Sequence, residues 1–302
     1  MEPRARHRSL GKAVEAEHFA TKIVIVIPTL NEREAVGKVL DGVKDAMDGH
    51  EYRMLVVDGH SIDGTDEIAR EKGAEVVYQR GKGYGDALRT GFLYARKRLD
   101  AGVIVMMDAD FTYDPRDIPE LVAPILRDEA DLVVGNRFAG MQKGAMSLVN
   151  RFGNRMLSLV AKLALRLNVY DTQSGMRAFR SELLDRVSLV AGGMPFALEM
   201  LAEALSADAR IDETPVSYRP RVGKTKLNPI KDGGRILGIT LRLMFDTQPL
   251  LFFGGIGTVL AVVGLFLHGI SGTLVFPFLL MIGAIPLFTL GLVISIIKRL
   301  KR

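Results

Sequence analysis

The stretch Val103-Ile104-Val105-Met106-Met107-Asp108-Ala109-Asp110 decides how this chain folds. Its first five residues form a short apolar run, typical of a strand buried in a parallel sheet, and the run ends directly in two carboxylates. The carboxyl ends of strands are where open α/β sheets bind ligands, and Asp108 and Asp110 point to the same side of an extended chain. We therefore expect an acidic site at one edge of a sheet.

Two carboxylates placed so close together need a cation or a proton between them. Mg2+ and Mn2+ prefer oxygen ligands and commonly bridge carboxylates to nucleotide phosphates, so we expect a ligand that carries a diphosphate. The alternative is a polar loop that caps the following helix, because Asp114-Pro115 is also typical of a helix start.

Strands alternate with helices before this stretch. We expect strands at Lys22 to Ile27, Met54 to Val57 and Glu75 to Tyr78, with a helix after each of the first two. Such an alternation predicts a mostly parallel sheet connected by right-handed crossovers. The glycine-rich piece Gly81 to Gly85 matches no phosphate-binding motif, and we interpret it as a flexible turn that lets the backbone approach a ligand.

Three of the expected strands end in polar residues, at Pro28 to Glu32, Asp58 to Asp63 and Asp108 to Asp110. Because the carboxyl ends of neighbouring parallel strands lie at one edge of a sheet, these loops are expected to form one acidic crevice.

The C-terminal part of the chain is apolar. From Thr247 to Ile297 the only ionisable side chain is His268, between the apolar spans Pro249 to Leu267 and Thr273 to Ile297. Crossing the hydrocarbon core takes roughly 20 apolar residues, so we expect a transmembrane hairpin. The alternative, two helices buried in a soluble protein, is disfavoured because neither span has a polar face.

The net charge of +5 does not indicate a nucleic acid partner, because basic residues gather beside the apolar spans. They are Lys231, Arg235 and Arg242 before the first span, and Lys298, Arg299, Lys301 and Arg302 after the second. By the positive-inside rule, the main domain is expected on the cytoplasmic face. The chain has no cysteine, and residues 1–21 are expected to form a disordered basic extension without the apolar core of a signal peptide.

A basic amphipathic helix is expected between Met146 and Val169. Its basic residues Arg151, Arg155, Lys162 and Arg166 recur at helical spacing, and apolar residues cover much of the remaining surface. Such a helix can lie at a membrane surface and bind an anion, or it can be a core helix with a solvated basic face.

The order of motifs resembles that of a known family. The motifs are Pro-Thr-Leu-Asn-Glu (28–32), Val-Val-Asp-Gly-His-Ser-Ile-Asp-Gly-Thr (56–65), Gly-Lys-Gly-Tyr-Gly-Asp-Ala-Leu (81–88), Asp-Ala-Asp (108–110), Gly-Asn-Arg-Phe (135–138), Asp-Thr-Gln-Ser-Gly-Met-Arg-Ala-Phe (171–179) and Arg-Val-Gly-Lys-Thr-Lys-Leu (221–227). Together they resemble family 2 glycosyltransferases with a GT-A fold, and within them the dolichyl-phosphate mannose synthase group and its polyprenyl-phosphate hexosyltransferase relatives. The resemblance runs from about residue 22 to residue 246.

This resemblance implies a set of functional residues. The implied donor-binding residues, for a nucleotide-sugar, are Pro28, Leu30, Glu32, Asp58, Asp108, Ala109, Asp110, Arg221 and Lys226. Asp108, Asp110 and Thr112 would hold Mg2+ or Mn2+, with Asp110 as the principal ligand, and Asp108, Asp110 and Arg221 are the implied catalytic residues. Arg137, Arg151, Arg155 and Ser158 fall at or near positions that the family uses for the acceptor phosphate.

Three positions depart from the family pattern. Thr112 replaces the usual Gln or Ser ligand, while Leu30 and Gly59 stand where Tyr and a second Asp are common. The last two departures fall near the nucleotide, so the choice between GDP and UDP stays open.

The resemblance also implies a division of the chain. It predicts a cytoplasmic GT-A domain at 22–228, an interfacial helix at 229–246, and two transmembrane helices with a basic tail at 247–302. The implied reaction moves a hexose from GDP-mannose or a UDP-sugar to dolichyl or polyprenyl phosphate, with inversion at the anomeric carbon.

Other readings remain to be weighed. The absence of tryptophan excludes the Gln-x-x-Arg-Trp motif of processive polysaccharide synthases, and no G-x-G-x-x-G follows the first strand, as an oxidoreductase would require. Transfer to another acceptor and a catalytically inactive, membrane-tethered nucleotide-binding protein stay open. The sequence also leaves the identity of the sugar and the formation of a homo-oligomer undecided.

Overall fold

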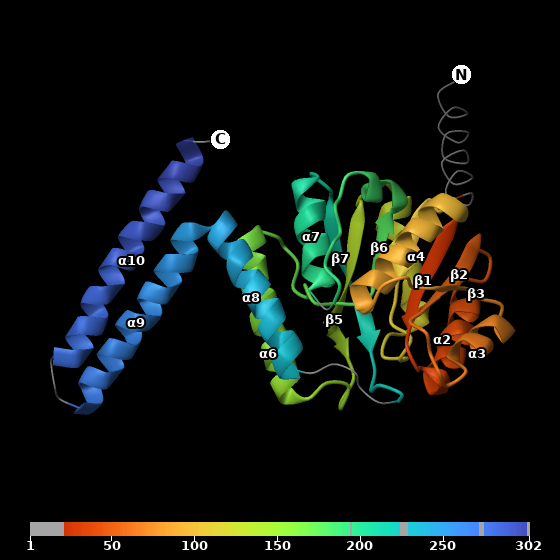
Figure 1. Ribbon diagram of the computed structural model, residues 1–302, viewed down its shortest axis with the longest axis horizontal. Helices are drawn as coiled ribbons and strands as arrows, with labels where there is room; N and C mark the ends of the chain where they lie inside the picture. Colours follow the sequence, from red (N-terminus) through yellow and green to blue (C-terminus); the bar gives the residue numbers. More distant parts are fainter. Residues whose placement is uncertain (1–20, 194, 224–228, 272–274, 301–302) are drawn as a thin grey trace, which may run out of the picture. The chain divides into compact units, whose positions relative to one another are not determined.

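A computed structural model describes residues 21–193, 195–223, 229–271 and 275–300 (Figure 1). The chain divides into two compact units, one that runs to Ser158 and resumes at Asn168–Gly233, and one formed by Leu159–Leu167 with the chain from Gly234. The N-terminal extension predicted at 1–21 lies outside the described residues except for Thr21.

The first unit contains a seven-stranded sheet in the order β3-β2-β1-β4-β6-β5-β7. Its strands are β1 (Ile23–Thr29), β2 (Tyr52–Asp58), β3 (Glu75–Tyr78), β4 (Val103–Met106), β5 (Leu132–Met141), β6 (Arg177–Arg180) and β7 (Ile211–Tyr218). Strand β6 runs antiparallel to both of its neighbours, and the other pairs are parallel. The mostly parallel α/β sheet predicted from the sequence is confirmed, and the antiparallel insertion of β6 is new.

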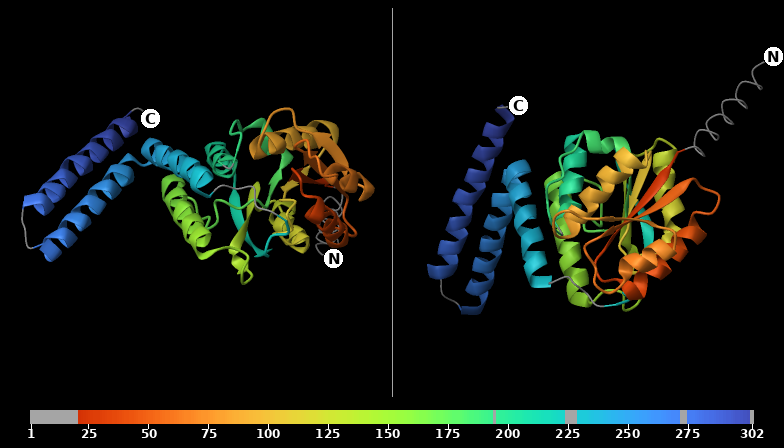
Figure 2. Two further views of the ribbon diagram at one scale, coloured as in Figure 1. Left: turned by 60° about the horizontal axis from the view of Figure 1, so that its bottom comes forward. Right: turned by 45° about the vertical axis from the view of Figure 1, so that its right-hand side comes forward.

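Helices lie on both faces of this sheet, as the two views of Figure 2 show. They are α2 (Arg33–Ala46), α3 (Thr65–Glu71), α4 (Tyr84–Arg98), α5 (Ile118–Leu126), α6 (Leu148–Leu165) and α7 (Phe196–Ser206), with short 3-10 turns η1 (Pro115–Asp117) and η2 (Ser181–Asp185). Because both faces are covered, the central strands are apolar on both sides and read as continuous runs.

The alternation of side chains along β1 assigns each face to its helices. Ile23, Ile25 and Ile27 belong to the core cluster that includes the apolar stripes of α2 and α5. On the opposite face, α4 approaches at Gly91, where an added Cβ would lie 2.4 Å from Val26 Cγ1. Full burial of each such aliphatic side chain stabilises the fold by about 1.5–3 kcal/mol, so a larger residue at position 91 would disturb this packing.

The sheet order places the three polar strand ends side by side. Strand β1 lies between β2 and β4, and all three run parallel, with Thr29 paired to Asp58 and Val26 paired to Met106. The loops that follow these strands therefore emerge at the same edge, as the sequence predicted.

The second unit contains the rest of α8 (Pro229–Thr247), with α9 (Pro249–Ser271) and α10 (Val275–Leu300). Helices α9 and α10 pack along each other where the Phe288 ring fits against two glycines: an added Cβ would lie 3.1 Å from the ring at Gly254 and 3.0 Å from it at Gly257. Among the described residues, Pro249–His268 is long and apolar enough to cross a membrane, and Ile282–Ile297 is a shorter apolar stretch. The helical hairpin is present, and its two membrane crossings remain a prediction.

Candidate active site

The two carboxylates that follow β4 are held by different neighbours. Asp110 is 7% exposed, and its Oδ1 accepts hydrogen bonds from Thr112 N (3.0 Å) and Thr112 Oγ1 (2.6 Å). Asp108 keeps a partly exposed edge, and its Oδ1 accepts from the Tyr84 hydroxyl at 2.9 Å. Burial and the charge of Asp110 raise the pKa of Asp108 to about 7. The predicted pair of repelling carboxylates is therefore present.

The donors at this position fit a hard divalent cation. They are the oxygens of Asp108 and Asp110, with the Thr112 hydroxyl engaged in holding Asp110. No group of three or more His, Cys, Asp or Glu side chains suited to a metal occurs among the described residues. Mg2+ and Mn2+ need few protein carboxylates when phosphate oxygens and water complete their coordination.

Arg221, which follows strand β7 in the chain, forms ion pairs with Asp110 and Glu32. Its Nη1 is 2.9 Å from Asp110 Oδ2, and its Nη2 donates to Glu32 Oε1 at 2.6 Å. The neighbouring backbone is fixed as well, because Val222 N donates to the Asp110 carbonyl at 3.1 Å. Three of the predicted donor residues therefore meet at one point, while Lys226 lies outside the described residues.

The loops after β1 and β2 are tied to each other. Asp58 is fully buried and accepts from Thr29 Oγ1 (2.9 Å), Ser61 N (2.7 Å) and Ser61 Oγ (2.6 Å). Glu32 N donates to Thr65 Oγ1 at 2.8 Å. Asp58 thus organises the loop at the predicted nucleotide site.

The two departures near the nucleotide are neighbours in space. A Cβ added to Gly59 would lie 3.4 Å from Leu30 Cδ1 and 3.5 Å from Gln79 Nε2. Leu30 is exposed at the rim, and Pro28, the last predicted donor residue of β1, is half-buried. The two departures from the family pattern, Leu30 and Gly59, therefore lie side by side.

The sequence interpretation missed Tyr84. Its hydroxyl fixes one oxygen of Asp108, while Gly175 makes room for the other, since a Cβ there would lie 2.6 Å from Asp108 Oδ2. A tyrosine inside the glycine-rich motif was the available signal, but its partner comes from a different strand end.

The glycine-rich piece itself lies against another backbone segment of the chain. Gly85 N donates to Gly192 O at 3.2 Å, and a Cβ on Gly85 would lie 2.1 Å from Ala191 O. Gly83 has φ +93°, a conformation that favours glycine. Glu199 in turn accepts from the backbone amide of Ala191. Within the described chain these glycines admit a neighbouring backbone, and this packing aims Tyr84 at Asp108.

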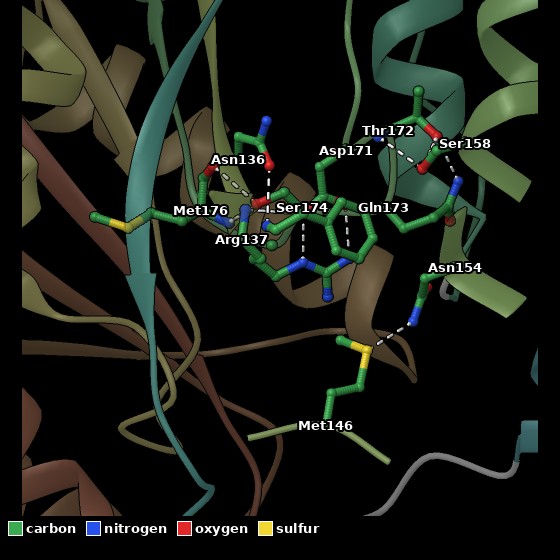
Figure 3. A network of polar contacts seen from close by, with 12 residues as sticks. Asn136, Arg137, Met146, Asn154, Ser158, Asp171, Thr172, Gln173, Ser174 and Met176 are labelled. Atoms are coloured by element: carbon green, nitrogen blue, oxygen red, sulfur yellow. Dashed lines mark hydrogen bonds and ion pairs between the residues drawn. The ribbon is translucent and has the colours of Figure 1, made fainter. Parts of the chain in front are cut away.

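Two of the predicted acceptor residues belong to a buried network (Figure 3). Arg137 donates to Asp171 from Nε (2.7 Å), Nη2 (2.8 Å) and its backbone amide (3.0 Å). Ser158 Oγ accepts from Thr172 N at 3.1 Å. The positive charge of Arg137 also acts to lower the pKa of Asp108, so this network lies near the acidic pair.

Arg151 and Arg155, at the start of α6, are in a different state. Neither has a carboxylate within ion-pair distance among the residues that the structure describes, and Arg151 Nε is buried without a hydrogen-bond partner. The Arg155 guanidinium lies 5.3 Å from the centre of the Phe138 ring, which Arg137 also approaches to 5.9 Å. The Arg155 guanidinium, which has no carboxylate partner in the described part of the chain, therefore shares the Phe138 ring with the compensated Arg137.

The first half of α6 exposes large apolar side chains. Leu148, Val149 and Phe152 are 82%, 80% and 69% exposed. A core helix with a solvated basic face is expected to bury such residues, so their exposure favours the membrane-surface interpretation of this half of α6. The helix presents both apolar and basic residues at its surface, as a membrane-surface helix does.

Known proteins resemble this chain in sequence and in fold. Residues 24–188 match the family described as Glycosyl transferase family 2. Glycosyltransferase AglJ of Haloferax volcanii is 35% identical over 245 residues, or 80% of this chain and 78% of the relative. A dolichyl-phosphate hexose transferase from the same organism is 35% identical over 222 residues, or 73% of this chain and 92% of the relative.

Solved structures also resemble this chain in fold. One of them is glucosyl-3-phosphoglycerate synthase from Mycobacterium tuberculosis in complex with Mn2+, UDP-glucose and phosphoglyceric acid. The TM-score is 0.60 at 24% identity, covering 78% of this chain and 82% of that structure. This likeness confirms the predicted GT-A architecture.

Proposed function

Because the chain belongs to glycosyl transferase family 2, we propose that it transfers a hexose from a nucleoside-diphosphate sugar to dolichyl or polyprenyl phosphate. The observation that carries this proposal is that the same chain has an acidic site at Asp108 and Asp110 and two arginines, Arg151 and Arg155. Neither arginine has a carboxylate partner among the described residues. The name of the dolichyl-phosphate hexose transferase relative supports the same acceptor.

The acidic half is suited to the donor. Asp108 and Asp110 would address the sugar and the diphosphate, while the loops at Pro28 to Glu32 and at Asp58 would hold the base and ribose. When bound, a Mg2+ or Mn2+ ion would supply the positive charge that lets diphosphate approach these carboxylates. The mycobacterial synthase was solved in complex with Mn2+ and UDP-glucose, which is consistent with this cofactor.

The basic half is suited to an anionic acceptor. Arg151 and Arg155 would bind the lipid phosphate and offset its repulsion from the donor diphosphate. A phosphate oxygen is already ionised near pH 7, so it attacks the anomeric carbon without a strong general base. The bond from that carbon to the nucleoside diphosphate breaks, and Arg221 stabilises the departing negative charge. A single displacement inverts the anomeric centre.

A membrane location follows from the acceptor. We propose that α9 and α10 cross the bilayer as a hairpin, and that the exposed apolar residues of α6 and the helix α8 lie at its surface. Basic residues flank the hairpin on both sides, which favours a catalytic unit on the cytoplasmic face.

The test is transfer of radiolabel from GDP-mannose, UDP-glucose or UDP-N-acetylglucosamine to dolichyl phosphate by the full chain in detergent, with Mn2+ or Mg2+. A lipid-extractable product that a chelator abolishes, formed from one donor, is the expected result and names the sugar. Nucleotide binding without any lipid product would overturn the acceptor and leave another acceptor, or an inactive binding protein, as the function.

A further inference from the structure

Arg221 already occupies the position where a cation would meet Asp110. Its guanidinium spans two carboxylates, 2.9 Å from Asp110 and 2.6 Å from Glu32. These two carboxylates come from loops far apart in sequence, and no other ionic partner of Asp110 occurs among the described residues. One arginine therefore neutralises part of the charge that the site gathers.

Both carboxylate oxygens of Asp110 already have partners, which leaves little room for a second cation. Its Oδ1 accepts two hydrogen bonds from Thr112, and its Oδ2 faces Arg221. A divalent cation binds carboxylate oxygens directly, so it competes with the guanidinium for Oδ2. The two cations also repel each other at this distance, which makes simultaneous occupation unfavourable.

We propose that Arg221 is a resident counterion of the metal site, which a divalent cation displaces from Asp110 and which then pairs with the donor diphosphate. This inference rests on the proposed function, because it assigns the displaced guanidinium to the same donor. Glu32 is a second anchor that keeps Arg221 beside the site during the exchange.

The exchange has a thermodynamic consequence. A metal ion that binds without nucleotide must break the pair between Arg221 and Asp110, and the guanidinium then gains no new anionic partner in place of Asp110. With a nucleoside diphosphate present, the guanidinium gains a new anionic partner. Metal and nucleotide should therefore strengthen each other's binding, and the coupling must be reciprocal.

The same segment provides a matched control. Arg219 lies two residues earlier, donates its backbone amide to the Thr112 carbonyl at 2.7 Å, and forms its ion pair with Asp114. It therefore shares the backbone path of Arg221 without contacting Asp108 or Asp110 in the described structure.

The experiment measures Mn2+ binding to the full chain in detergent from the loss of the free-ion electron paramagnetic resonance signal, without nucleotide. We expect Arg221→Gln to bind Mn2+ at least about fivefold more tightly than wild type, the lower end of typical coupling between sites, while Arg219→Gln is unchanged. Arg221→Lys, which keeps the charge, should stay closer to wild type. Equal or weaker Mn2+ binding by Arg221→Gln would overturn the proposal.

A second arm adds GDP or UDP, and thermal unfolding verifies that each variant is folded. The gain in Mn2+ affinity on adding nucleotide should be smaller for Arg221→Gln than for wild type, and an equal gain would contradict the exchange. Because no acceptor is present, this outcome is separate from that of the transfer assay. A failed transfer with tighter Mn2+ binding rejects only the lipid acceptor.

Discussion

The acidic and basic halves of the site handle charge in opposite ways. In the acidic half, Asp110 has its own counterion, Arg221. In the basic half, Arg137 is compensated by Asp171, whereas Arg151 and Arg155 have no carboxylate partner among the described residues. A fully buried charge needs a partner of opposite charge within the protein, whereas a charge that is partly exposed to solvent can bind an external ligand instead. We therefore expect an external anion to bind at the arginines that have no carboxylate partner. The paired charges either stabilise the fold or exchange their partner for a ligand.

The largest expected effect comes from breaking the compensated pair of the basic half. Asp171→Asn leaves the Arg137 guanidinium buried without a carboxylate, which should lower the free energy of unfolding by about 3–5 kcal/mol. Chemical denaturation of the full chain in detergent measures this loss. Asp185→Asn, at an exposed pair with Arg96, should cost less than about 1 kcal/mol. Equal losses for the two variants would mean that Arg137 is not a structural cation.

Removing the charge of Asp110 should affect catalysis rather than folding. Asp110→Asn keeps the shape of the side chain but removes the charge that faces Arg221 and the proposed cation, so kcat/KM should fall by about 10²–10³-fold. Asp66→Asn, at a surface hydrogen bond with Tyr78, is the control and should retain activity. Full activity of Asp110→Asn in the transfer assay would refute the assignment of the acidic half.

The unpaired guanidinium groups allow the two halves to be separated kinetically. Arg151→Gln should raise KM for the lipid phosphate by roughly 10- to 100-fold, the range for a lost charged hydrogen bond, with KM for the donor unchanged. Arg166→Gln, whose partner Gln248 lies elsewhere on the chain, should change neither value. An equal rise in both Michaelis constants would show that Arg151 does not distinguish acceptor from donor.

A smaller effect is expected at Tyr84, which orients one carboxylate of the acidic half. Asp108 is only partly ionised at neutral pH because its pKa is raised to about 7, so the lost hydrogen bond should cost no more than an ordinary one. Tyr84→Phe should then raise KM for the donor by roughly 3- to 10-fold with little change in kcat. Tyr94→Phe removes a hydroxyl bonded to Glu75 and serves as control. A fall in kcat alone would contradict a positioning role.

The smallest effect should come from the ring beside the unpaired arginine. Phe138→Leu keeps every charge but removes the face on which Arg155 rests, which should raise KM for the lipid phosphate by about two- to fivefold. Kinetics with the lipid phosphate and the donor varied in turn measure both Michaelis constants. A rise in donor KM instead would assign Phe138 to the other half.

The sequence by itself determined the first four strands of the sheet, their polar ends and the acidic pair, but not strands β5, β6 and β7. Strand β4 is an apolar run because both of its faces are covered, and α2 repeats its apolar residues at 3.6 because one face is buried. These patterns arise from neighbours within a few residues, so they can be read locally. The edge at which Asp58 and Asp108 gather follows from the direction of parallel strands alone.

Only the tertiary structure decided which charges are compensated. Arg221 and Glu32 lie 189 residues apart, and Arg137 and Asp171 lie 34 apart, so no local pattern connects them. For the same reason the glycine-rich motif did not show that Gly83 and Gly85 pack against the backbone of Ala191 and Gly192, or that Tyr84 reaches Asp108. The type and spacing of residues predict what chemistry is available, whereas long-range packing decides which groups remain free to perform it.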